Sequence, residues 1–251
     1  MFVFADSLLG GKGDRSADAS AGRSYLLHQA KIKEANDSAT RTADTSRLLE
    51  RVASIPNLAR ALLNVAGNKG APGVDGLSID EVVEAAPELL PKLSRALHSG
   101  TYQPGDIRRV WIPKPGGGQR GLGIPNVVDR LVQQAVHQIL EPIFEPTFHD
   151  SSHGFRLNRG AQTAIAQAKR YLTDGYSITV GLDLSKFFDR VHHQRLLSRL
   201  AQRVRDGRIL KLVHRMLKAK VVMSDGTRVA TEEGAPQGGP ATPQTMLQKV
   251  G

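Results

Sequence analysis

Apolar residues recur at helical spacing through most of the chain after Ser46. Aliphatic side chains between residues 48 and 63 form one stripe, and Pro56 is expected to break or kink the helix that carries them. A second stripe covers residues 128–143. These stripes predict amphipathic helices packed around an apolar core. Further helices are expected over residues 78–97 in two short pieces, over 161–172, from about 193, and over 209–219.

Alternating apolar and polar residues predict a small antiparallel sheet. Residues 108–124 have the pattern of two strands joined by a glycine-rich turn, and residues 221–231 contain a second hairpin. In a further short strand, residues 177–182, alternation places the apolar side chains on one face and leaves Asp183 on the other. The expected fold class is therefore α/β (α+β), rich in helix with a small antiparallel sheet.

Charge and composition narrow the choice of partners. The formal net charge of +10 and the pI near 10.1 point to a polyanion, with nucleic acid ahead of membrane. No apolar run approaches the roughly 20 residues needed to span a bilayer. The chain contains no cysteine, which excludes disulfides and thiolate metal sites, so a cytoplasmic location is expected. Residues 1–44 are expected to form a disordered or partly helical tail.

Asp183 is the first candidate for chemistry. It ends a half-buried strand and is followed by a turn with Lys186 and two aromatic residues. A carboxylate in that position could hold Mg²⁺ against a phosphate. The alternative is an aspartate that only caps the turn, and the spacing by itself favours this plainer interpretation. Phosphate-binding residues elsewhere in the chain would favour the interpretation of Asp183 as a metal ligand.

The hairpin expected over residues 108–124 could be that partner. Arg108, Lys114 and Arg120 lie on its two arms and its bend, and the glycines between them let the backbone approach a ligand closely. Cations on a flexible hairpin can close over a triphosphate. The alternative is a solvated basic hairpin without a ligand.

Arg156 and Arg159 precede the helix expected over residues 161–172. Two arginines at a helix N-terminus oppose the helix dipole unless an anion is also present. A backbone phosphate of a nucleic acid would supply it, and so would a local carboxylate such as Asp150. The helix is expected to bury an apolar side that ends at Leu172.

Several short motifs follow one another along the chain. They are Ile112-Pro-Lys-Pro-Gly-Gly-Gly, Arg120-Gly-Leu-Gly-Ile-Pro, Asp129-Arg, Ser152-His-Gly-Phe-Arg, Leu182-Asp-Leu-Ser-Lys-Phe-Phe-Asp and Gly234-Ala-Pro-Gln-Gly-Gly. The ordered set resembles the successive motifs of group II intron-type reverse transcriptases, from about Ser46 to Pro243. The resemblance implies a right-hand polymerase, with fingers over residues 45–176 and an incomplete palm over residues 177–251.

That resemblance also implies partners and a metal cofactor. The partners are an RNA template or intron RNA, a DNA primer and a deoxynucleoside triphosphate (dNTP), and the cofactor is Mg²⁺ in a two-ion site. Asp183 matches the first metal-binding aspartate of the family, with the backbone carbonyl of Leu184 as a further ligand. Asp189 is expected to cap the following helix instead of binding metal.

The nucleotide-binding residues follow from the same resemblance. Arg108, Lys114 and Arg120 match the fingers cations that hold the triphosphate. Phe188 matches the aromatic residue that blocks a ribose 2′-OH, and a bulky ring can reject that hydroxyl by shape. Gln237 matches the glutamine that lines the nucleotide pocket.

The chain departs from the family after Pro243. There the family normally continues into an apolar helix and a hairpin with Tyr/Phe-x-Asp-Asp, whereas this sequence ends at Gly251 and contains no Asp-Asp pair. Asp183 alone would have to hold two ions, so the chain by itself is expected to lack useful polymerase activity. An interrupted palm sheet is also expected to leave strand edges and apolar surface uncovered, which invites pairing with another chain.

Two other functions stay open at this point. The chain could be a non-enzymatic, maturase-like protein that binds intron RNA through its basic surface. With the resemblance set aside, it could also be a metal-dependent nuclease.

Overall fold

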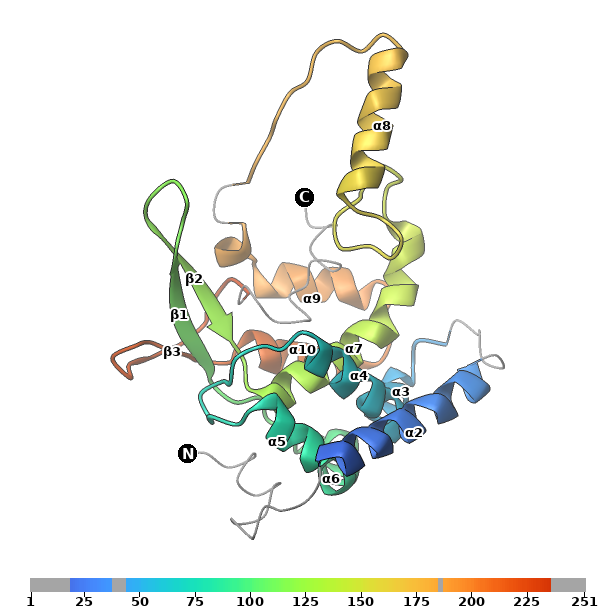
Figure 1. Cartoon of the computed structure of the whole chain (residues 1–251), viewed down its shortest axis with the longest axis vertical. Coiled ribbons are helices and arrows are strands. Elements are labelled where there is room, and N and C mark those ends of the chain that lie inside the picture. The colour runs from blue at the N-terminus through green and yellow to red at the C-terminus, as the bar shows by residue number, and fades with distance from the viewer. Residues whose placement is uncertain (1–18, 38–43, 185–186, 236–251) are drawn as a thin grey trace.

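The computed structural model describes residues 19–37, 44–184 and 187–235 (Figure 1). The helices are α2 (Ala19–Asp37), α3 (Leu48–Ala53), α4 (Ile55–Gly67), α5 (Ile79–Glu84), α6 (Ala86–His98), α7 (Val127–Phe144), α8 (Ala161–Thr173), α9 (His193–Ala201) and α10 (Gly207–Leu217), with short 3-10 turns at Glu145–Thr147 and Phe188–Arg190. The strands are β1 (Ile107–Pro113), β2 (Gln119–Ile124), β3 (Val221–Val222) and β4 (Arg228–Val229). No described helix is both long enough and apolar enough to cross a membrane.

Helices α2 to α7 form the main core, and the apolar stripes predict this for α3, α4 and α7. Helix α2 lies within residues 1–44, which the sequence predicts as a disordered or partly helical tail, and its Leu26 is fully buried in this core. The break expected at Pro56 is confirmed, because α3 ends at Ala53 and α4 begins at Ile55, with the proline in its first turn. The core also contains a polar link between two helices. The side-chain amide of Asn57, fully buried in α4, donates to the carbonyl of Ala135 in α7 at 3.1 Å. This bond satisfies a buried polar group while fixing α4 on α7.

A buried tyrosine and aspartate connect the start of α7 to the chain that enters β1. The hydroxyl of Tyr102 donates to Asp129 at 2.5 Å, and the N–H of Gly105 donates to the other carboxylate oxygen at 3.1 Å. Burial raises the pKa of Asp129 to about 6, although these hydrogen bonds act in the opposite direction. The connection sets where the following hairpin leaves the helical core.

Asp206 joins the C-terminal helices to the N-terminal ones. Its carboxylate accepts the N–H of Leu49 at 2.9 Å and the N–H of Arg208 at 3.1 Å, so it satisfies donors in the first turns of both α3 and α10. The Arg208 guanidinium contacts Asp206 at 2.9 Å and Glu50 at 2.8 Å. Burial alone would raise the pKa of Asp206, but hydrogen bonds from Arg208 and Leu49 together hold it below its usual value.

The sheet has the strand order β2-β1-β3-β4. Both predicted hairpins are present, since β1 pairs antiparallel with β2 and β3 pairs antiparallel with β4. The two hairpins join through parallel pairing of β1 with β3, in which Ile107 lies opposite Val221. The sheet is therefore mixed: it is antiparallel within each hairpin, as expected, and parallel where the two hairpins join. A parallel pair needs a long crossover, and here the chain from α7 to α10 provides it.

The strand predicted over residues 177–182 is absent. These residues are extended but belong to no ladder in the described parts of the chain. Their apolar side chains face solvent, with Ile178 85 %, Val180 77 % and Leu182 93 % exposed. A strand requires a neighbour for its backbone groups, and none of the described residues takes that place.

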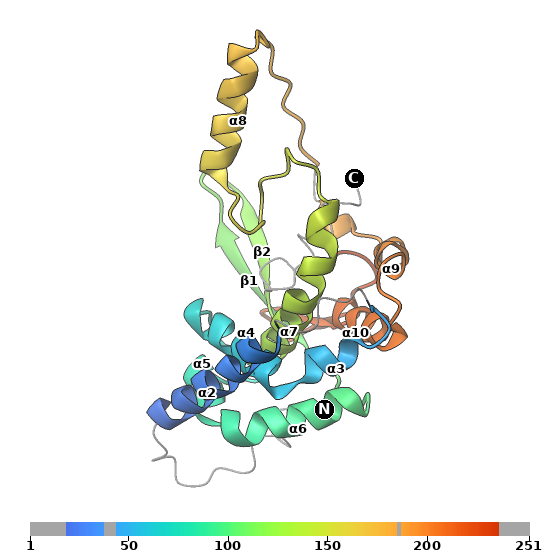
Figure 2. The ribbon, with the colours of Figure 1, turned by 90° about the vertical axis from the view of Figure 1, so that its right-hand side faces the viewer.

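Helix α8 forms where it is predicted, but its apolar side is not buried. None of its residues is buried, and the side chains of Ile165 and Leu172 are more than half exposed. Figures 1 and 2 show α8 standing away from the helical core, with an extended segment leading back from its end. We call residues 161–184 the arm. The arm therefore carries exposed apolar surface.

The exposed apolar face of the arm is expected to bind a hydrophobic dye. Changing Ile178, Val180 and Leu182 together to serine removes three large exposed side chains, so the fluorescence of bound anilinonaphthalene sulfonate should fall clearly. Thr179→Ser, on the opposite face of the same segment, is the control and should leave the signal unchanged. Equal fluorescence from the triple variant and the unaltered chain would show that the dye binds elsewhere.

Candidate active site

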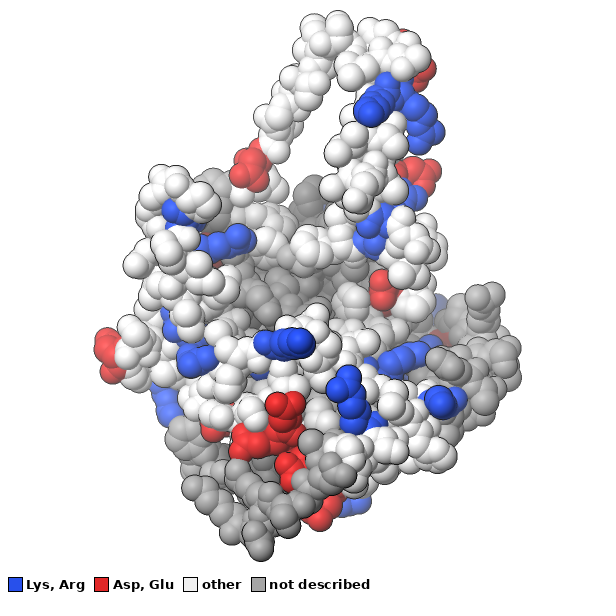
Figure 3. Space-filling model, in the orientation of Figure 1, with Lys and Arg blue, Asp and Glu red and all other residues white. Residues whose placement is uncertain are grey.

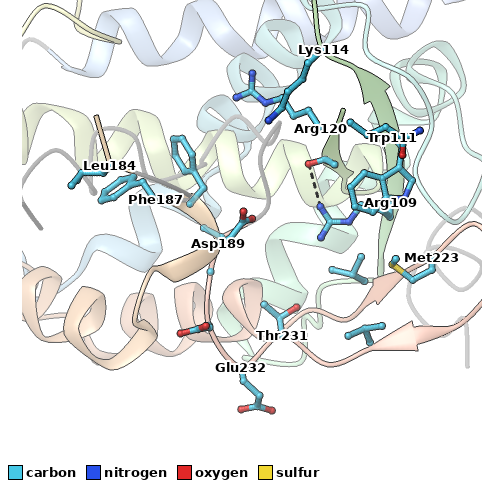
Figure 4. A pocket seen from close by; sticks show the side chains of 18 of the residues that line it. Arg109, Trp111, Lys114, Arg120, Leu184, Phe187, Asp189, Met223, Thr231 and Glu232 are labelled. Atoms are coloured by element: carbon cyan, nitrogen blue, oxygen red, sulfur yellow. Dashed lines mark hydrogen bonds between the residues drawn. The ribbon is translucent and has the colours of Figure 1, made fainter. Parts of the chain in front are cut away.

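A cavity of about 1590 Å³ opens between the β1–β2 hairpin, the end of the arm and the loop that follows β4. Figure 4 shows Lys114 and Arg120 projecting from the hairpin on one side, and Phe187 and Asp189 lying on the other. Asp183 also lines this cavity. The structure therefore brings together the acidic residue and two of the cations that the sequence singles out, although residues 114–120 and 183 are far apart in the chain.

The hairpin reaches the cavity through a tight glycine turn. Gly117 and Gly118 have φ angles of 91° and 78°, values that side-chain-bearing residues rarely adopt, and the N–H of Lys114 donates to the Gly118 carbonyl at 3.1 Å. Lys114 and Arg120 are both exposed at this tip. Their charges therefore face solvent and the open side of the cavity.

Arg109, and not Arg108, lines the cavity from β1. Arg109 donates to the carbonyl of Gly121 at 3.2 Å, and its guanidinium lies 5.8 Å from the centre of the Trp111 ring. Arg108 lies on the opposite face of the strand and does not line this cavity, so the structure gives no support to its predicted contact with a triphosphate. The two-residue period of a strand could have revealed this, because Arg109, Trp111 and the cavity share a face.

The opposite wall consists of Asp183, Leu184 and the turn that holds Phe187 and Phe188. The two aromatic rings pack edge to face, with centroids 5.5 Å apart. Asp189 belongs to this wall as well, so the prediction that it caps the next helix is wrong. The residue that caps α9 is His192, whose ring nitrogen accepts the N–H of Arg195 at 3.4 Å.

The floor of the cavity is held by hydrogen bonds between two turns. The N–H of Gly234 donates to the Val191 carbonyl at 2.9 Å, and the N–H of Ala235 donates to the Phe188 carbonyl at 2.8 Å. Gly234 has a φ of 86°, and a Cβ there would lie 3.0 Å from the Asp189 carbonyl oxygen. Only glycine fits this position without displacement of the neighbouring backbone.

His193 holds the Gly234 loop from the side away from the cavity. The ring is buried, and its Nε2 donates to the Gly234 carbonyl at 2.7 Å. Nδ1 is buried as well and has no hydrogen-bond partner within the described ranges. His193 thus fastens the loop that contains Gly234 to the first turn of α9, although it does not line the cavity.

Replacing His193 by leucine is expected to lower the free energy of unfolding by about 1–2 kcal/mol, because the Gly234 carbonyl loses its donor inside the protein. Glutamine carries an N–H donor of similar reach, so His193→Gln should lose less. Urea denaturation of the full chain measures both. Equal losses for leucine and glutamine would mean that ring packing, and not this hydrogen bond, accounts for the effect.

The carboxylates of the cavity do not match a two-ion Mg²⁺ site. Asp183, Asp189, Glu232 and Glu233 line it, yet no group of three or more His, Cys, Asp or Glu residues able to hold a metal occurs in the described parts of the chain. Each Mg²⁺ ion needs about six oxygen ligands. The described residues therefore supply too few donors for the two-ion site that the resemblance implies.

The two arginines before α8 bind the protein itself. The largely buried Arg156 contacts Glu145 at 2.8 Å and donates to the carbonyls of His149 and Ser152. Arg159 contacts the carboxylate and the carbonyl of Asp150. Local acceptors, and not a nucleic acid, thus provide the expected anionic partners. The structure does not support the predicted nucleic-acid contacts of Arg156 and Arg159.

Of the remaining predicted residues, two line the cavity and one lies outside the described residues. Phe188 and Leu184 both line the cavity. Phe188 is half-buried, and Leu184 is the residue whose backbone carbonyl is expected to bind metal. Gln237 lies outside the described residues.

Comparisons with known proteins agree with the order of motifs. The family described as "Reverse transcriptase (RNA-dependent DNA polymerase)" matches residues 112–250. Protein YkfC of Escherichia coli (strain K12) is 40 % identical over 204 residues, which are 78 % of this chain and 53 % of that protein. The group II intron-encoded protein LtrA of Lactococcus lactis subsp. cremoris is 35 % identical over 184 residues, which are 73 % of this chain and 30 % of LtrA.

A solved structure shares the fold. The partial Cas6-RT-Cas1–Cas2 complex contains a chain that aligns with a TM-score of 0.54 and 18 % sequence identity, covering 81 % of this chain and 34 % of that one. At this identity the match concerns the fold alone. The chain spans about half of the length of YkfC and less than a third of LtrA.

Proposed function

Because the chain belongs to the reverse transcriptase family and its relatives include group II intron-encoded proteins, we propose that its cavity binds the incoming dNTP of an intron-type reverse transcriptase. The observation that carries the proposal is the convergence of Asp183, Lys114 and Arg120 on one cavity. An RNA template or intron RNA and a DNA primer are the other proposed partners. The net charge of +10 favours such polyanions.

Lys114 and Arg120 would neutralise the triphosphate. Figure 3 shows Lys and Arg side chains on the hairpin, beside the hollow in this face of the molecule. Cation–phosphate hydrogen bonds are about twice as strong as neutral ones, and the planar guanidinium can bind two phosphate oxygens at once. The glycine turn at the tip lets the hairpin backbone come close to the same phosphates.

Phe188 would contact the sugar. Its ring packs edge to face on Phe187, and the N–H of Ala235 donates to its backbone carbonyl, so both the ring and the backbone of Phe188 have defined neighbours. A ring fixed beside the 2′ position leaves no room for a ribose hydroxyl. The cavity is therefore expected to prefer deoxynucleotides.

Asp183 would supply a carboxylate next to the bound phosphates. When Mg²⁺ is present, it supplies charge neutralisation for phosphoryl transfer, and Mg²⁺ is commonly held by one or two carboxylates together with substrate phosphates. Asp183 fits a single contact with an ion that arrives on the nucleotide. The described residues do not complete a second ion site.

Sugar discrimination tests the proposed nucleotide site. Titration of the full chain with fluorescent dATP and ATP analogues should show tighter binding of dATP, by about tenfold. Phe188→Ala should reduce that ratio toward one, whereas Phe148→Ala, a change of the same size away from the cavity, should not. Equal affinity of the unaltered chain for the two nucleotides would contradict the proposed role of Phe188.

Two activity assays separate the proposal from its alternatives. The chain alone is expected not to extend a DNA primer on an RNA template, and extension that disappears with Asp183→Ala would refute this. Cleavage of labelled RNA or DNA in the absence of dNTP would favour a nuclease. RNA binding without any dNTP affinity would favour a non-enzymatic, maturase-like role.

A further inference from the structure

Residues 190–211 form a strongly basic segment that the cavity does not use. Its one carboxylate is Asp206, which is buried and bonded to Arg208. None of these residues lines the cavity. The cations of the segment besides Arg208 are Arg190, Arg195, Arg199, Arg203, Arg205 and Lys211.

Helix α9 sorts its residues into two faces. Leu196 and Leu200 are buried against the core, whereas Arg195, Arg199 and Arg203 are exposed at intervals of four residues. Residues four apart lie one above the other on a helix, so the guanidiniums of Arg195 and Arg199 share the side of α9 that faces away from the core, and Arg203 follows in the turn just after the helix ends at Ala201. We call Arg195, Arg199 and Arg203 the α9 basic face.

No ion pair joins the α9 basic face to a carboxylate in the part of the chain that the structure describes. Like charges four residues apart on a helix repel and destabilise it. Asp206 cannot relieve this repulsion, because its oxygens are engaged by Leu49 and Arg208. An external anion would relieve it.

The α9 basic face lies apart from the cavity. Figure 2 shows α9 at the edge of the molecule that lies away from the β1–β2 hairpin. Binding at one place therefore does not block the other. A long polyanion could occupy the α9 basic face while a nucleotide occupies the cavity.

We propose that the α9 basic face binds the phosphodiester backbone of RNA. This inference rests on the proposed function, and it replaces Arg156 and Arg159 as the nucleic-acid contact. Arg199 lies about 6 Å beyond Arg195 along the helix, at 1.5 Å per residue, so neighbouring phosphates of one strand can each meet a guanidinium, and Arg203 adds a third cation just past the helix end. Such contacts position a nucleic acid without reading its sequence.

The residues between the arginines favour RNA over a membrane. Ser198 and Gln202 are exposed beside Arg195 and Arg199. A membrane-binding helix would carry bulky apolar residues next to its cations, and this face has none among its described residues. Ser and Gln can instead hydrogen-bond the 2′-OH, the group that distinguishes RNA from DNA.

The salt dependence of binding to a labelled RNA duplex tests the inference. The full chain is compared with the triple variant Arg195→Ala, Arg199→Ala, Arg203→Ala, with circular dichroism to check folding. Each lost phosphate contact should make the slope of log K against log salt less negative by about 0.7–0.9, which is about 2–3 for the three. The matched control is Arg23→Ala, Arg51→Ala, Arg95→Ala, three exposed arginines on other helices.

The proposal predicts that the triple variant loses slope and affinity while the control keeps most of both, and that a DNA duplex of the same sequence binds more weakly. Equal losses in the two triple variants would overturn it, because net charge alone would then explain binding. Equal affinity for RNA and DNA, or α9-dependent binding to anionic vesicles instead of RNA, would also overturn it. The dATP titration tests the cavity separately from RNA binding. Affinity for dATP should be unchanged in the α9 variant, and absence of dATP binding would contradict only the proposed nucleotide site.

Discussion

Asp206→Ala is expected to lower the free energy of unfolding by about 2–4 kcal/mol. One buried carboxylate accepts N–H groups in the first turns of both α3 and α10, so its removal leaves donors unsatisfied in two helices at once. The ion pair with Arg208 adds little, because that guanidinium is 45 % exposed. Urea denaturation of the full chain measures the loss.

The stability lost in Asp206→Ala should depend on pH. Since the pKa of Asp206 is lowered in the folded chain, its contribution is fully present above the ordinary aspartate pKa of about 3.9 and disappears as pH falls through the folded value. Asp129 acts in the opposite direction, because its raised pKa destabilises the fold as pH rises from about 4 to about 6. The variant is therefore compared with the unaltered chain at each pH. Asp80→Ala, at an exposed aspartate, should change stability by less than about 0.5 kcal/mol, and an equal loss there would contradict the account.

Removing the two cations at the tip of the β1–β2 hairpin that line the cavity, Lys114→Ala with Arg120→Ala, is expected to weaken dATP binding by about 100-fold. A hydrogen bond to a charged group contributes about 1.5–3 kcal/mol, and solvent at the exposed tip reduces each contribution to about a factor of ten. The loss should shrink for dAMP, which lacks the outer phosphates. Isothermal titration of the full chain measures both ligands.

Arg108→Ala is the matched control for this pair. It removes a cation from the same hairpin, but on the face of β1 that does not line the cavity. Binding of dATP should stay within about twofold of the unaltered chain, because the charge removed lies away from the triphosphate. If Arg108→Ala lowered the affinity for dATP as much as Lys114→Ala does, Arg108 would have to contact the triphosphate after all.

Local patterns predicted the helices well. The stripe over residues 128–143 became α7, because its period matches a helix with one face in the core. The start of α5 is also determined locally: Ser78 and Glu81 form a capping box, and both of its hydrogen bonds join residues three apart. Such features depend only on residues close together in the chain, so the sequence is enough to predict them.

Features that depend on distant partners were missed. The pattern over residues 177–182 is that of a strand, but a strand forms only beside another, and the described residues offer no such neighbour. Helix α8 keeps its apolar stripe exposed for the same reason. The parallel pairing of β1 with β3 joins segments more than 100 residues apart, which periodicity does not reveal.

The sequence indicated several residues that the fold brings to one cavity, and others that the fold places elsewhere. The order of the motifs indicated Asp183, Lys114, Arg120 and Phe188, which all line the cavity. Charge alone indicated Arg156, yet a guanidinium between nearby acceptors binds those acceptors first. A sequence shows which residues carry charge, whereas only the fold shows which charges are already paired.

The most direct test of the account is the Mg²⁺ dependence of dATP binding to the full chain and to Asp183→Asn. The account predicts that Mg²⁺ strengthens binding to the unaltered chain, and that the variant loses this gain while keeping the Mg²⁺-independent affinity from Lys114 and Arg120. If Asp183→Asn retained the full Mg²⁺ effect, Asp183 would not lie beside the bound triphosphate and the proposed site would be refuted.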